Sequence, residues 1–189
     1  MALNEFIISG AQIHFNNFLK PSSHLPLAMA NIGAGAGHCS AWLMENVLLH
    51  KDSILYDVDT WNGWDPQVIP IDYEHIESAY DANLTVHRDK LLKFKMHSNS
   101  FWQHTKEEQF DFIYLNGSRH GLQVAEDMAN AFHSLKEGGI MAIAAYTYGP
   151  HLSSWERPKE AVDSALKLLG TQIDVFEKSS QVWCVKNGW

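Results

Sequence analysis

The feature that most constrains this chain is an apolar run that breaks into closely spaced glycines before a helical pattern begins. It reads Met29-Ala-Asn-Ile-Gly-Ala-Gly-Ala-Gly-His-Cys-Ser40, with Gly33, Gly35 and Gly37 in the turn. A strand, a turn and a helix of this kind form a cradle for a nucleotide-like ligand, because glycine permits positive φ and close backbone approach. About twenty residues further on, the run Ile54-Leu-Tyr-Asp-Val-Asp59 ends in acids, which are placed to accept hydrogen bonds from a ribose diol.

The spacing of these glycines separates the candidate ligands. A dinucleotide fingerprint requires G-x-G-x-x-G, whereas here Gly37 is followed directly by His38, and the Gly-Lys-Ser/Thr ending of a phosphate-binding P-loop is absent. S-adenosylmethionine carries no pyrophosphate, so a looser glycine turn and an acid for its ribose suit it better. In the alternative interpretation the turn only lets a helix pack closely on a sheet, which applies to Gly35 in particular.

Length, charge and cysteine usage limit the class of protein. With 189 residues, 46% of them hydrophobic, the chain can bury one core and is too short for two ordinary domains. The net charge of -8 and the thin spread of 14 basic residues argue against nucleic acid or an anionic membrane surface as the main partner. Only 2 cysteines, no signal-peptide pattern and no apolar stretch of membrane-spanning length together indicate a cytoplasmic protein.

Apolar runs alternate with helical patterns along the chain, which predicts an α/β fold. We expect a Rossmann-like sheet of seven mostly parallel strands with helices on both faces, in a single domain over 1–189 with a helical extension over 1–22. The expected strands lie near 27–32, 53–58, 91–96, 110–115, 139–145, 172–177 and 181–186. The expected helices lie near 3–19, 38–50, 72–86, 121–136 and 157–169.

Two local signals sharpen the second half of this prediction. Lys136-Glu-Gly-Gly139 has the composition of a basic last helical turn followed by a glycine stop, and it leads into the apolar run Ile140-Met-Ala-Ile-Ala-Ala145. Near the end of the chain, Lys178-Ser-Ser180 is a polar turn between two strand-like runs. That arrangement predicts an antiparallel hairpin at the edge of the sheet.

Histidine and tryptophan are frequent, with 11 and 7 copies. No pair of histidines has the spacing of a metal motif, so most of them are expected to be structural or solvated. Trp61, Trp64, Trp102 and Trp155 fall in expected loops beyond strand ends. There they either wall a pocket, or cap the core or an interface between identical copies in a homo-oligomer.

Four sequence motifs follow one another in a fixed order: Asn31-Ile-Gly-Ala-Gly-Ala-Gly37, Leu55-Tyr-Asp-Val-Asp-Thr-Trp61, Phe110-Asp-Phe-Ile-Tyr-Leu-Asn-Gly-Ser118 and Leu135-Lys-Glu-Gly-Gly-Ile140. In these motifs the chain resembles class I S-adenosylmethionine-dependent methyltransferases. More narrowly, it is similar to the small-molecule O-methyltransferase-like group, whose members read E-I-G-x-x-x-G-x-S, F-D-x-I-Y-I-D-G-S-H and L-K-x-G-G-I-x-x-x-D-D-Y. The resemblance covers residues 27–186 and implies S-adenosylmethionine as cofactor and a small-molecule acceptor.

The resemblance also assigns cofactor contacts residue by residue. The implied cofactor-binding residues are Asn31, Gly33, Gly35, Gly37, Asp59, Asn99, Ser100 and Asn116. The glycines are expected under the methionine part of the cofactor, and Asp59 on the ribose hydroxyls. Asn99 and Ser100 match the segment that contacts adenine, and an ordinary polar turn is the alternative for them.

The chain departs from the group at its acidic positions. Asn31 stands where the group has the glutamate of E-I-G, and Asn116 stands at the aspartate of D-G-S-H. Ala144 and Ala145 replace the paired aspartates of D-D-Y. In relatives that use a divalent ion, such carboxylate oxygens hold Mg²⁺ or a similar cation. Because alanine cannot ligate a metal and one amide is a poor substitute, we predict no metal site.

The expected catalysis rests on positioning, because the cofactor sulfonium is already activated for in-line displacement. If a base is needed, His120 after the fourth strand or His151 after the fifth is placed to act, since histidine titrates near neutral pH. Each of these histidines equally fits a solvated loop residue. Tyr146, the tyrosine of the D-D-Y position, and Tyr148 are candidates to orient the acceptor, with loop packing as the alternative.

Three functions are open from the sequence. The first is metal-independent methyl transfer to a small hydroxylated or sugar-like acceptor. The second is a catalytically silent module of the same fold, kept for binding or assembly, which the loss of the acids motivates. The third is a nicotinamide-dependent oxidoreductase, which the glycine spacing and the expected terminal hairpin disfavour.

Overall fold

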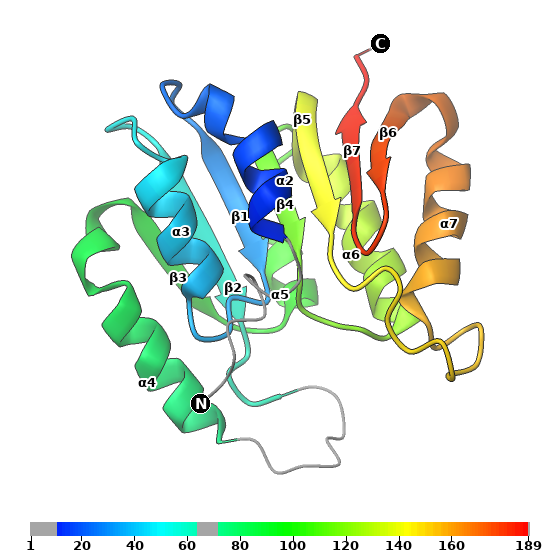
Figure 1. The fold of residues 1–189 in the computed structure, drawn as a ribbon, viewed down its shortest axis with the longest axis horizontal. Helices are drawn as coiled ribbons and strands as arrows, with labels where there is room; N and C mark the ends of the chain where they lie inside the picture. Colours follow the sequence, from blue (N-terminus) through cyan, green and yellow to red (C-terminus); the bar gives the residue numbers. More distant parts are fainter. Residues whose placement is uncertain (1–10, 64–71, 189) are drawn as a thin grey trace.

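In the computed structural model, which describes residues 11–63 and 72–188, seven strands form one sheet (Figure 1). The strands are β1 (Ala28–Ile32), β2 (Ile54–Asp59), β3 (Leu91–Lys95), β4 (Phe110–Leu115), β5 (Leu135–Ile143), β6 (Ile173–Lys178) and β7 (Val182–Lys186). Their order is β3-β2-β1-β4-β5-β7-β6, parallel from β3 to β5 and antiparallel at β7. The predicted fold class is confirmed, including the terminal hairpin.

Helices cover both faces of the sheet, as predicted. The helices are α2 (Ala11–Phe18), α3 (His38–Asn46), α4 (Tyr73–Asn83), α5 (Ser98–Trp102), α6 (Gly121–Ser134) and α7 (Pro158–Leu169). α2 and α3 pack on one face with α4 beside α3, and α5, α6 and α7 pack on the other (Figure 1). The Asp72 side chain caps α4 by accepting a hydrogen bond from the backbone N of His75 at 2.9 Å.

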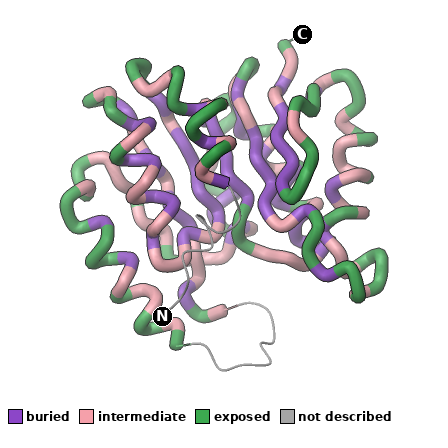
Figure 2. Tube along the Cα trace, in the orientation of Figure 1, coloured by how far each residue is buried: buried purple, intermediate pink, exposed green. Residues whose placement is uncertain are grey.

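Two apolar layers, one on each face, form the core, and the buried residues follow the strands in Figure 2. Phe15 of α2 is fully buried, and its ring centroid lies 5.2 Å from that of Trp183 on β7 in an edge-on contact. Met128 of α6 and Val162 of α7 are fully buried on the opposite face. Each such side chain contributes about 1.5–3 kcal/mol, so the sheet is a rigid support for the loops at its edges.

The carboxyl ends of the parallel strands meet at the lower edge of the sheet in Figure 1. Backbone hydrogen bonds join the segments that leave them: Gly33 N donates to Val58 O at 2.8 Å, and Asn116 N donates to Ile32 O at 2.8 Å. The parallel pairing therefore brings the glycine turn after β1, the acidic end of β2 and the segment after β4 to one place.

The predicted helix stop at Lys136–Gly139 is wrong, because this segment belongs to β5. α6 ends at Ser134, and Leu135 is fully buried in register with Phe110 of β4. The Lys136 Nζ atom lies 2.9 Å from both carboxylate oxygens of Asp111 on β4. Burial and a cross-strand ion pair outweigh the local tendency of the glycines to end a helix.

Candidate functional site

All three glycines of the turn between β1 and α3 have positive φ, but a side chain would meet different surroundings at each of them. A Cβ on Gly33, at φ +93°, would lie 2.5 Å from the backbone O of Asn116, so the turn passes very close to the end of β4. A Cβ on Gly37, at φ +79°, would lie 3.0 Å from the ring of Tyr80. A Cβ on Gly35, at φ +51°, would meet no described atom within 4 Å. Gly35 is therefore the glycine that a ligand can approach.

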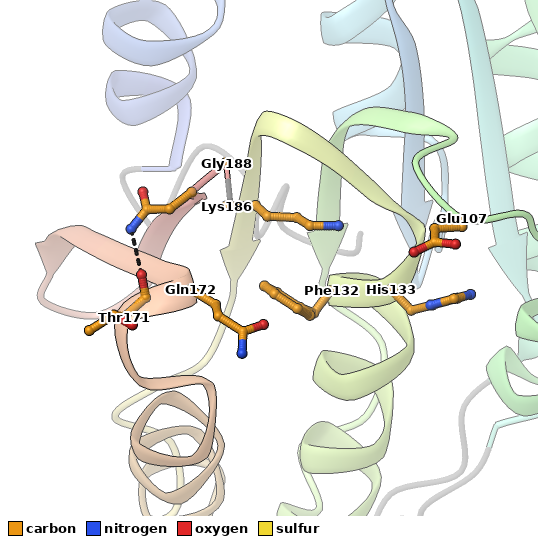
Figure 3. Close-up of a pocket in the computed structure, with 8 residues that line it drawn as sticks. Glu107, Phe132, His133, Thr171, Gln172, Lys186 and Gly188 are labelled. Carbon is orange, nitrogen blue, oxygen red and sulfur yellow. Dashed lines mark hydrogen bonds between the residues drawn. The ribbon is translucent and has the colours of Figure 1, made fainter.

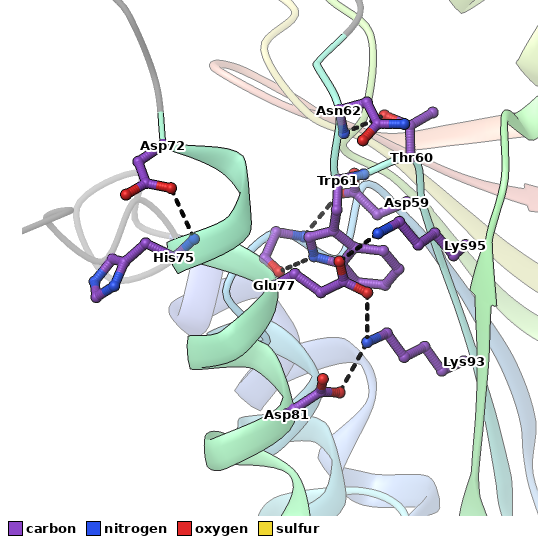
Figure 4. A network of polar contacts seen from close by, with 11 residues as sticks. Asp59, Thr60, Trp61, Asn62, Asp72, His75, Glu77, Asp81, Lys93 and Lys95 are labelled. Atoms are coloured by element: carbon purple, nitrogen blue, oxygen red, sulfur yellow. Dashed lines mark hydrogen bonds and ion pairs between the residues drawn. The ribbon is translucent and has the colours of Figure 1, made fainter.

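Asp59 at the end of β2 and Trp61 after it, both labelled in Figure 4, hold the backbone of Gly35 in place. Asp59 Oδ2 accepts a hydrogen bond from the Gly35 backbone N at 2.9 Å, and Asp59 Oδ1 accepts one from the Trp61 backbone N at 2.9 Å. The Trp61 indole Nε1 donates to the Gly35 backbone O at 2.9 Å. Each carboxylate oxygen can accept a second hydrogen bond, so Asp59 keeps acceptor capacity for a ligand hydroxyl while it anchors the turn.

Trp61 is a buried anchor with 2% of its surface exposed and φ +46°. Its ring centroid lies 4.8 Å from that of Tyr80 and 4.7 Å from the Lys93 Nζ atom. Lys93 of β3 also pairs with Glu77 of α4 at 2.9 Å, and hydrogen bonds from Lys95 and Lys93 lower the pKa of Glu77 (Figure 4). Trp61 thus caps the core beside the site, the second of the two roles considered for the loop tryptophans.

Behind the glycine turn lies a fully buried carboxylate, Asp57. Asp57 Oδ1 accepts hydrogen bonds from Asn31 Nδ2 at 3.1 Å and Ser40 Oγ at 2.8 Å, and Oδ2 accepts one from the Tyr80 hydroxyl at 2.9 Å. Burial raises the pKa of Asp57 to about 6, although the three hydrogen bonds favour its charged form. Asp57 thereby joins β1, β2, α3 and α4 around the turn.

Asn31 is 0% exposed, and its Oδ1 atom has no hydrogen-bond partner among the described residues. Its Nδ2 atom is held by Asp57 and lies 3.1 Å from Ser40 Oγ. A buried acceptor without a partner costs about 1–3 kcal/mol. Because this oxygen is enclosed by protein, the cofactor contact expected of Asn31 stays a prediction. The open side of Gly35 and the free acceptor capacity of Asp59 together fit a ligand that carries hydroxyl donors.

Asn99 and Ser100 lie in the short helix α5, where a polar turn was the alternative to an adenine contact. The Asn99 Oδ1 atom accepts a hydrogen bond from Gln123 Nε2 at 2.7 Å, and Asn99 Nδ2 donates to Glu126 Oε2 at 3.0 Å, so this side chain is bonded to α6. Ser100 is exposed. The adenine contact of both residues stays a prediction.

The positions that carry acids in the resembling group hold neutral side chains at the carboxyl edge. Asn116 is exposed after β4, Ala144 is buried after β5, and Ala145 has φ +54°. One neutral amide oxygen and two methyl groups do not fit a divalent cation, which prefers several oxygen ligands. Among residues 11–63 and 72–188, no group of three or more His, Cys, Asp or Glu side chains could hold a metal ion.

Both candidate bases stand in loops that leave this edge. His120 is the N-cap residue of α6, and its ring centroid lies 5.8 Å from that of Trp155 in an edge-on contact. His151 is exposed in the loop after β5. In the same two loops, the Arg119 guanidinium carbon lies 4.9 Å from the ring centroid of Tyr148, which is 44% exposed. The acceptor side therefore offers aromatic and basic groups, and the role of either histidine as a base stays a prediction.

Tyr146 is buried, with 6% of its surface exposed, and its hydroxyl faces α7. This hydroxyl donates to Asp163 Oδ1 at 2.9 Å and accepts from Lys159 Nζ at 3.0 Å, and Lys178 Nζ lies 2.7 Å from Asp163 Oδ1. Partial burial opposes the ionisation of Asp163, but hydrogen bonds from Lys159, Lys178 and Tyr146 outweigh it and lower its pKa to about 2. The cluster fixes the loop after β5 to α7 and the hairpin.

We expect Asp163→Asn to lower the free energy of unfolding by about 1 kcal/mol at pH 7, because two lysines lose their carboxylate partner in a half-exposed cluster. The pKa of Asp163 is depressed in the fold, so its stabilisation is present above about pH 4 and is lost as the pH falls towards 2. Urea denaturation at pH 7 and at about pH 2.5 measures this difference. Asp174→Asn, on the exposed face of β6, is the control and should change neither value.

Two hollows lie away from the glycine turn. A cavity of about 230 Å³ at the opposite edge of the sheet is lined by Lys186, Phe132 and His133 (Figure 3), and Lys186 Nζ donates to the Leu135 backbone O at 2.7 Å. A groove of about 500 Å³ runs between α6 and α7 beside Trp155. Neither hollow includes a residue predicted to bind the cofactor.

The glycine turn, the acid at the end of β2 and the terminal antiparallel hairpin define a Rossmann-like fold of the methyltransferase class. Residues 30–144, more than half of the chain, match a family described as a methyltransferase domain. The chain belongs to this family. No sequence among curated proteins matches it.

Solved structures of the same fold share little sequence with this chain. A candidate rRNA methylase from Clostridium thermocellum is 17% identical, with 94% of this chain and 95% of that chain covered and a TM-score of 0.69. A candidate O-methyltransferase from Klebsiella pneumoniae is 11% identical; the match covers 100% of this chain and 82% of that chain, and the TM-score is 0.66. The O-methyltransferase TomG from Streptomyces achromogenes, which is involved in tomaymycin synthesis, was solved in complex with S-adenosylmethionine. It is 12% identical to this chain, the match covers 96% of this chain and 80% of TomG, and the TM-score is 0.64.

The length and polarity of the helices bear on membrane association. Within the part of the chain that the structure describes, none of the helices has the length and apolar character needed to cross a bilayer.

Proposed function

We propose that this chain is an S-adenosylmethionine-dependent methyltransferase that acts on a small hydroxylated or sugar-like acceptor without a divalent metal. The observation that carries the proposal is Gly35, whose amide is held by Asp59 while its other side faces open space. Membership of a methyltransferase domain family supports the reaction class. The likeness of the fold to an O-methyltransferase solved with this cofactor supports the choice of ligand.

The residues around the turn fit this cofactor. When bound, it supplies a methyl group on a positively charged sulfur that is activated for in-line transfer. Asp59 has acceptor capacity left for the ribose hydroxyls. Gly33 and Gly37 keep the turn closed against β4 and Tyr80, which leaves the face of Gly35 to the ligand.

The loops after β4 and β5 act on the acceptor. Their part is to hold an acceptor hydroxyl in line with the methyl group and to remove its proton as the new bond forms. His120, fixed at the start of α6, is the first candidate for the base, and the exposed His151 is the second. Tyr146 acts through its contacts with Asp163 and Lys159 by holding the loop in which the acceptor binds.

Charge and ligand chemistry favour this acceptor class over the alternatives. Asn116, Ala144 and Ala145 offer no carboxylate for a divalent cation, which supports transfer without a metal. The net charge of -8 disfavours a nucleic-acid substrate. The cysteines Cys39 and Cys184 are free and buried, which fits a reducing, cytoplasmic setting.

Calorimetric titration with S-adenosylmethionine and with S-adenosylhomocysteine tests the proposal. We expect a Kd in the micromolar range, about -8 kcal/mol, with the same value in the presence of excess chelator, because no metal bridges the ligand. Incubation with pooled hydroxylated acceptors should then release S-adenosylhomocysteine. Absence of binding by either ligand would exclude a methyltransferase.

A second candidate function is a catalytically silent module, and the neutral residues at positions 116, 144 and 145 favour it. This candidate predicts binding of the cofactor without turnover on any acceptor in the pool. Both functions therefore predict cofactor binding in the titration, and only the enzyme predicts release of S-adenosylhomocysteine in the turnover assay.

A further inference from the structure

A buried negative charge lies directly behind the glycine turn with no cation paired to it. Asp57 is 0% exposed, and the groups that donate to it, Asn31, Ser40 and Tyr80, are all neutral. Among the described residues Asp57 makes no ion pair. Lys93 on the neighbouring strand lies 5.1 Å from the Tyr80 ring centroid, but it pairs with two carboxylates of α4.

This charge is costly in the fold without ligand. An ionised carboxylate buried among neutral groups is disfavoured by the loss of water, which the three hydrogen bonds only partly offset. Asparagine has the same shape and would avoid that cost. No side chain that the structure describes supplies a compensating positive charge, so a cationic ligand bound nearby would be favoured by this carboxylate.

The carboxylate is joined through Asn31 to the strand that leads into the glycine turn. Asp57 is in register with Asn31 on β1 and accepts from the Asn31 amide N, which leaves the opposite end of that amide, Oδ1, as the unpaired buried acceptor. Hydrogen bonds in series polarise one another, so the charge of Asp57 makes this oxygen more negative. Ser40, in the first turn of α3, connects the same carboxylate to the helix that follows the glycines.

We propose that Asp57 is a positioning residue that selects the charge of the ligand, so that the site prefers cationic S-adenosylmethionine to S-adenosylhomocysteine, whose sulfur is neutral. The inference rests on the function proposed above. The two ligands share the adenosine and the amino acid and differ in one methyl group and the positive charge on sulfur. A fixed negative charge in a poorly hydrated region distinguishes them through the Coulomb interaction, without direct contact.

The neutral residues at the carboxyl edge leave few negative charges beside the glycine turn. Positions 31, 116, 144 and 145 are acidic in the group that the chain resembles and neutral here. The negative charges next to the glycine turn are therefore those of β2, on Asp57 and Asp59. Asp59 is half-buried and partly screened by water, whereas Asp57 is screened by neutral donors alone.

The preference is expected to depend on pH, because a proton on Asp57 removes the charge. Burial raises the pKa of Asp57 to about 6, so the carboxylate is half ionised near that pH. The groups that face it are Tyr80 from α4, Cys39 from α3, Asp59 along β2 and Lys93 from β3. Burial and the charge of Asp57 raise the pKa of Tyr80 and of Cys39, so neither ionises below neutral pH. Of Asp57, Tyr80 and Cys39, Asp57 alone titrates in this interval.

The test compares Kd values for the two ligands in the wild type and in Asp57→Asn by calorimetry from about pH 5 to about pH 7.5. In the wild type we expect the preference for S-adenosylmethionine to rise across this range. In Asp57→Asn we expect it to be independent of pH and, at the upper end, on the order of tenfold smaller. An equal loss of affinity for both ligands, or no loss for either, would overturn the proposal.

Tyr80→Phe is the matched control, because it removes one donor to Asp57 and keeps the charge. Without this donor the pKa of Asp57 rises further, so the change in preference should move to higher pH with the same amplitude. If Asp57→Asn does not fold, the pH series of the wild type and of Tyr80→Phe decides the question. A wild type that binds neither ligand contradicts the proposed function, whereas one that binds both with a pH-independent ratio contradicts only the role of Asp57.

Discussion

Gly33→Ala is expected to lower the free energy of unfolding by roughly 3 kcal/mol or more, enough to leave much of the protein unfolded. Two costs add at this position. A side chain at φ +93° is strained. Its Cβ would also lie 2.5 Å from the backbone O of Asn116, which is held at the end of β4 by a hydrogen bond to Ile32. Urea denaturation followed by circular dichroism measures the loss.

Gly35→Ala is the control for this prediction. The substitution is the same and φ is again positive, at +51°, but no described atom lies within 4 Å of the new Cβ. We expect a loss of only about 1 kcal/mol in stability, together with weaker cofactor binding because the methyl group points into the ligand space. A Gly33→Ala variant as stable as Gly35→Ala would contradict the close approach of the turn to β4.

Asp59→Ala should weaken S-adenosylmethionine binding by roughly 1–3 kcal/mol, which is about fivefold to 150-fold. The carboxylate is lost both as the acceptor for the ribose hydroxyls and as the anchor of the Gly35 and Trp61 amides. The fold should persist, because Asp59 is half-buried and stands at the end of β2. Calorimetry gives the affinity, and circular dichroism confirms folding.

Asp59→Asn separates the two roles of this residue. The amide keeps one acceptor oxygen for an anchor but loses the charge and half of the acceptor capacity. We therefore expect an affinity between those of the wild type and Asp59→Ala. Asp52→Ala, an exposed acid before β2, should leave the affinity unchanged. Wild-type affinity in Asp59→Ala would mean that another group holds the ribose.

The sheet was predictable because its central strands are apolar runs bounded by clear turns. Ala28–Ile32 and Phe110–Leu115 are buried on both faces, so any shift of these segments would expose apolar side chains. The start of β5 was not predictable, because Lys136–Gly139 is locally typical of a helix end. Its strand conformation depends on Asp111 and Phe110 of the neighbouring strand, and such contacts are invisible in a single sequence.

The same limit applies to the site. Gly35 and Asp59 lie together because the parallel pairing of β1 with β2 places the glycine turn beside the end of β2. The partnership of Asp57 with Asn31, Ser40 and Tyr80 needs the register of two strands and the packing of α4. One signal was available in the sequence: an acid inside an apolar strand, two residues before the acid that ends it, requires buried partners.

The hydrogen bonds that hold Gly35 to Asp59 and Trp61 also bear on the thermodynamics of binding. Ordering a flexible backbone costs about 1–2 kcal/mol per residue, and many loops incur this cost only when a ligand arrives. Here the turn is already fixed by both its amide and its carbonyl. Little entropy is therefore lost by the protein on association, and the affinity should reflect the ligand's own contacts. The turn behaves as a rigid receptor, whose selectivity depends on fit more than on rearrangement.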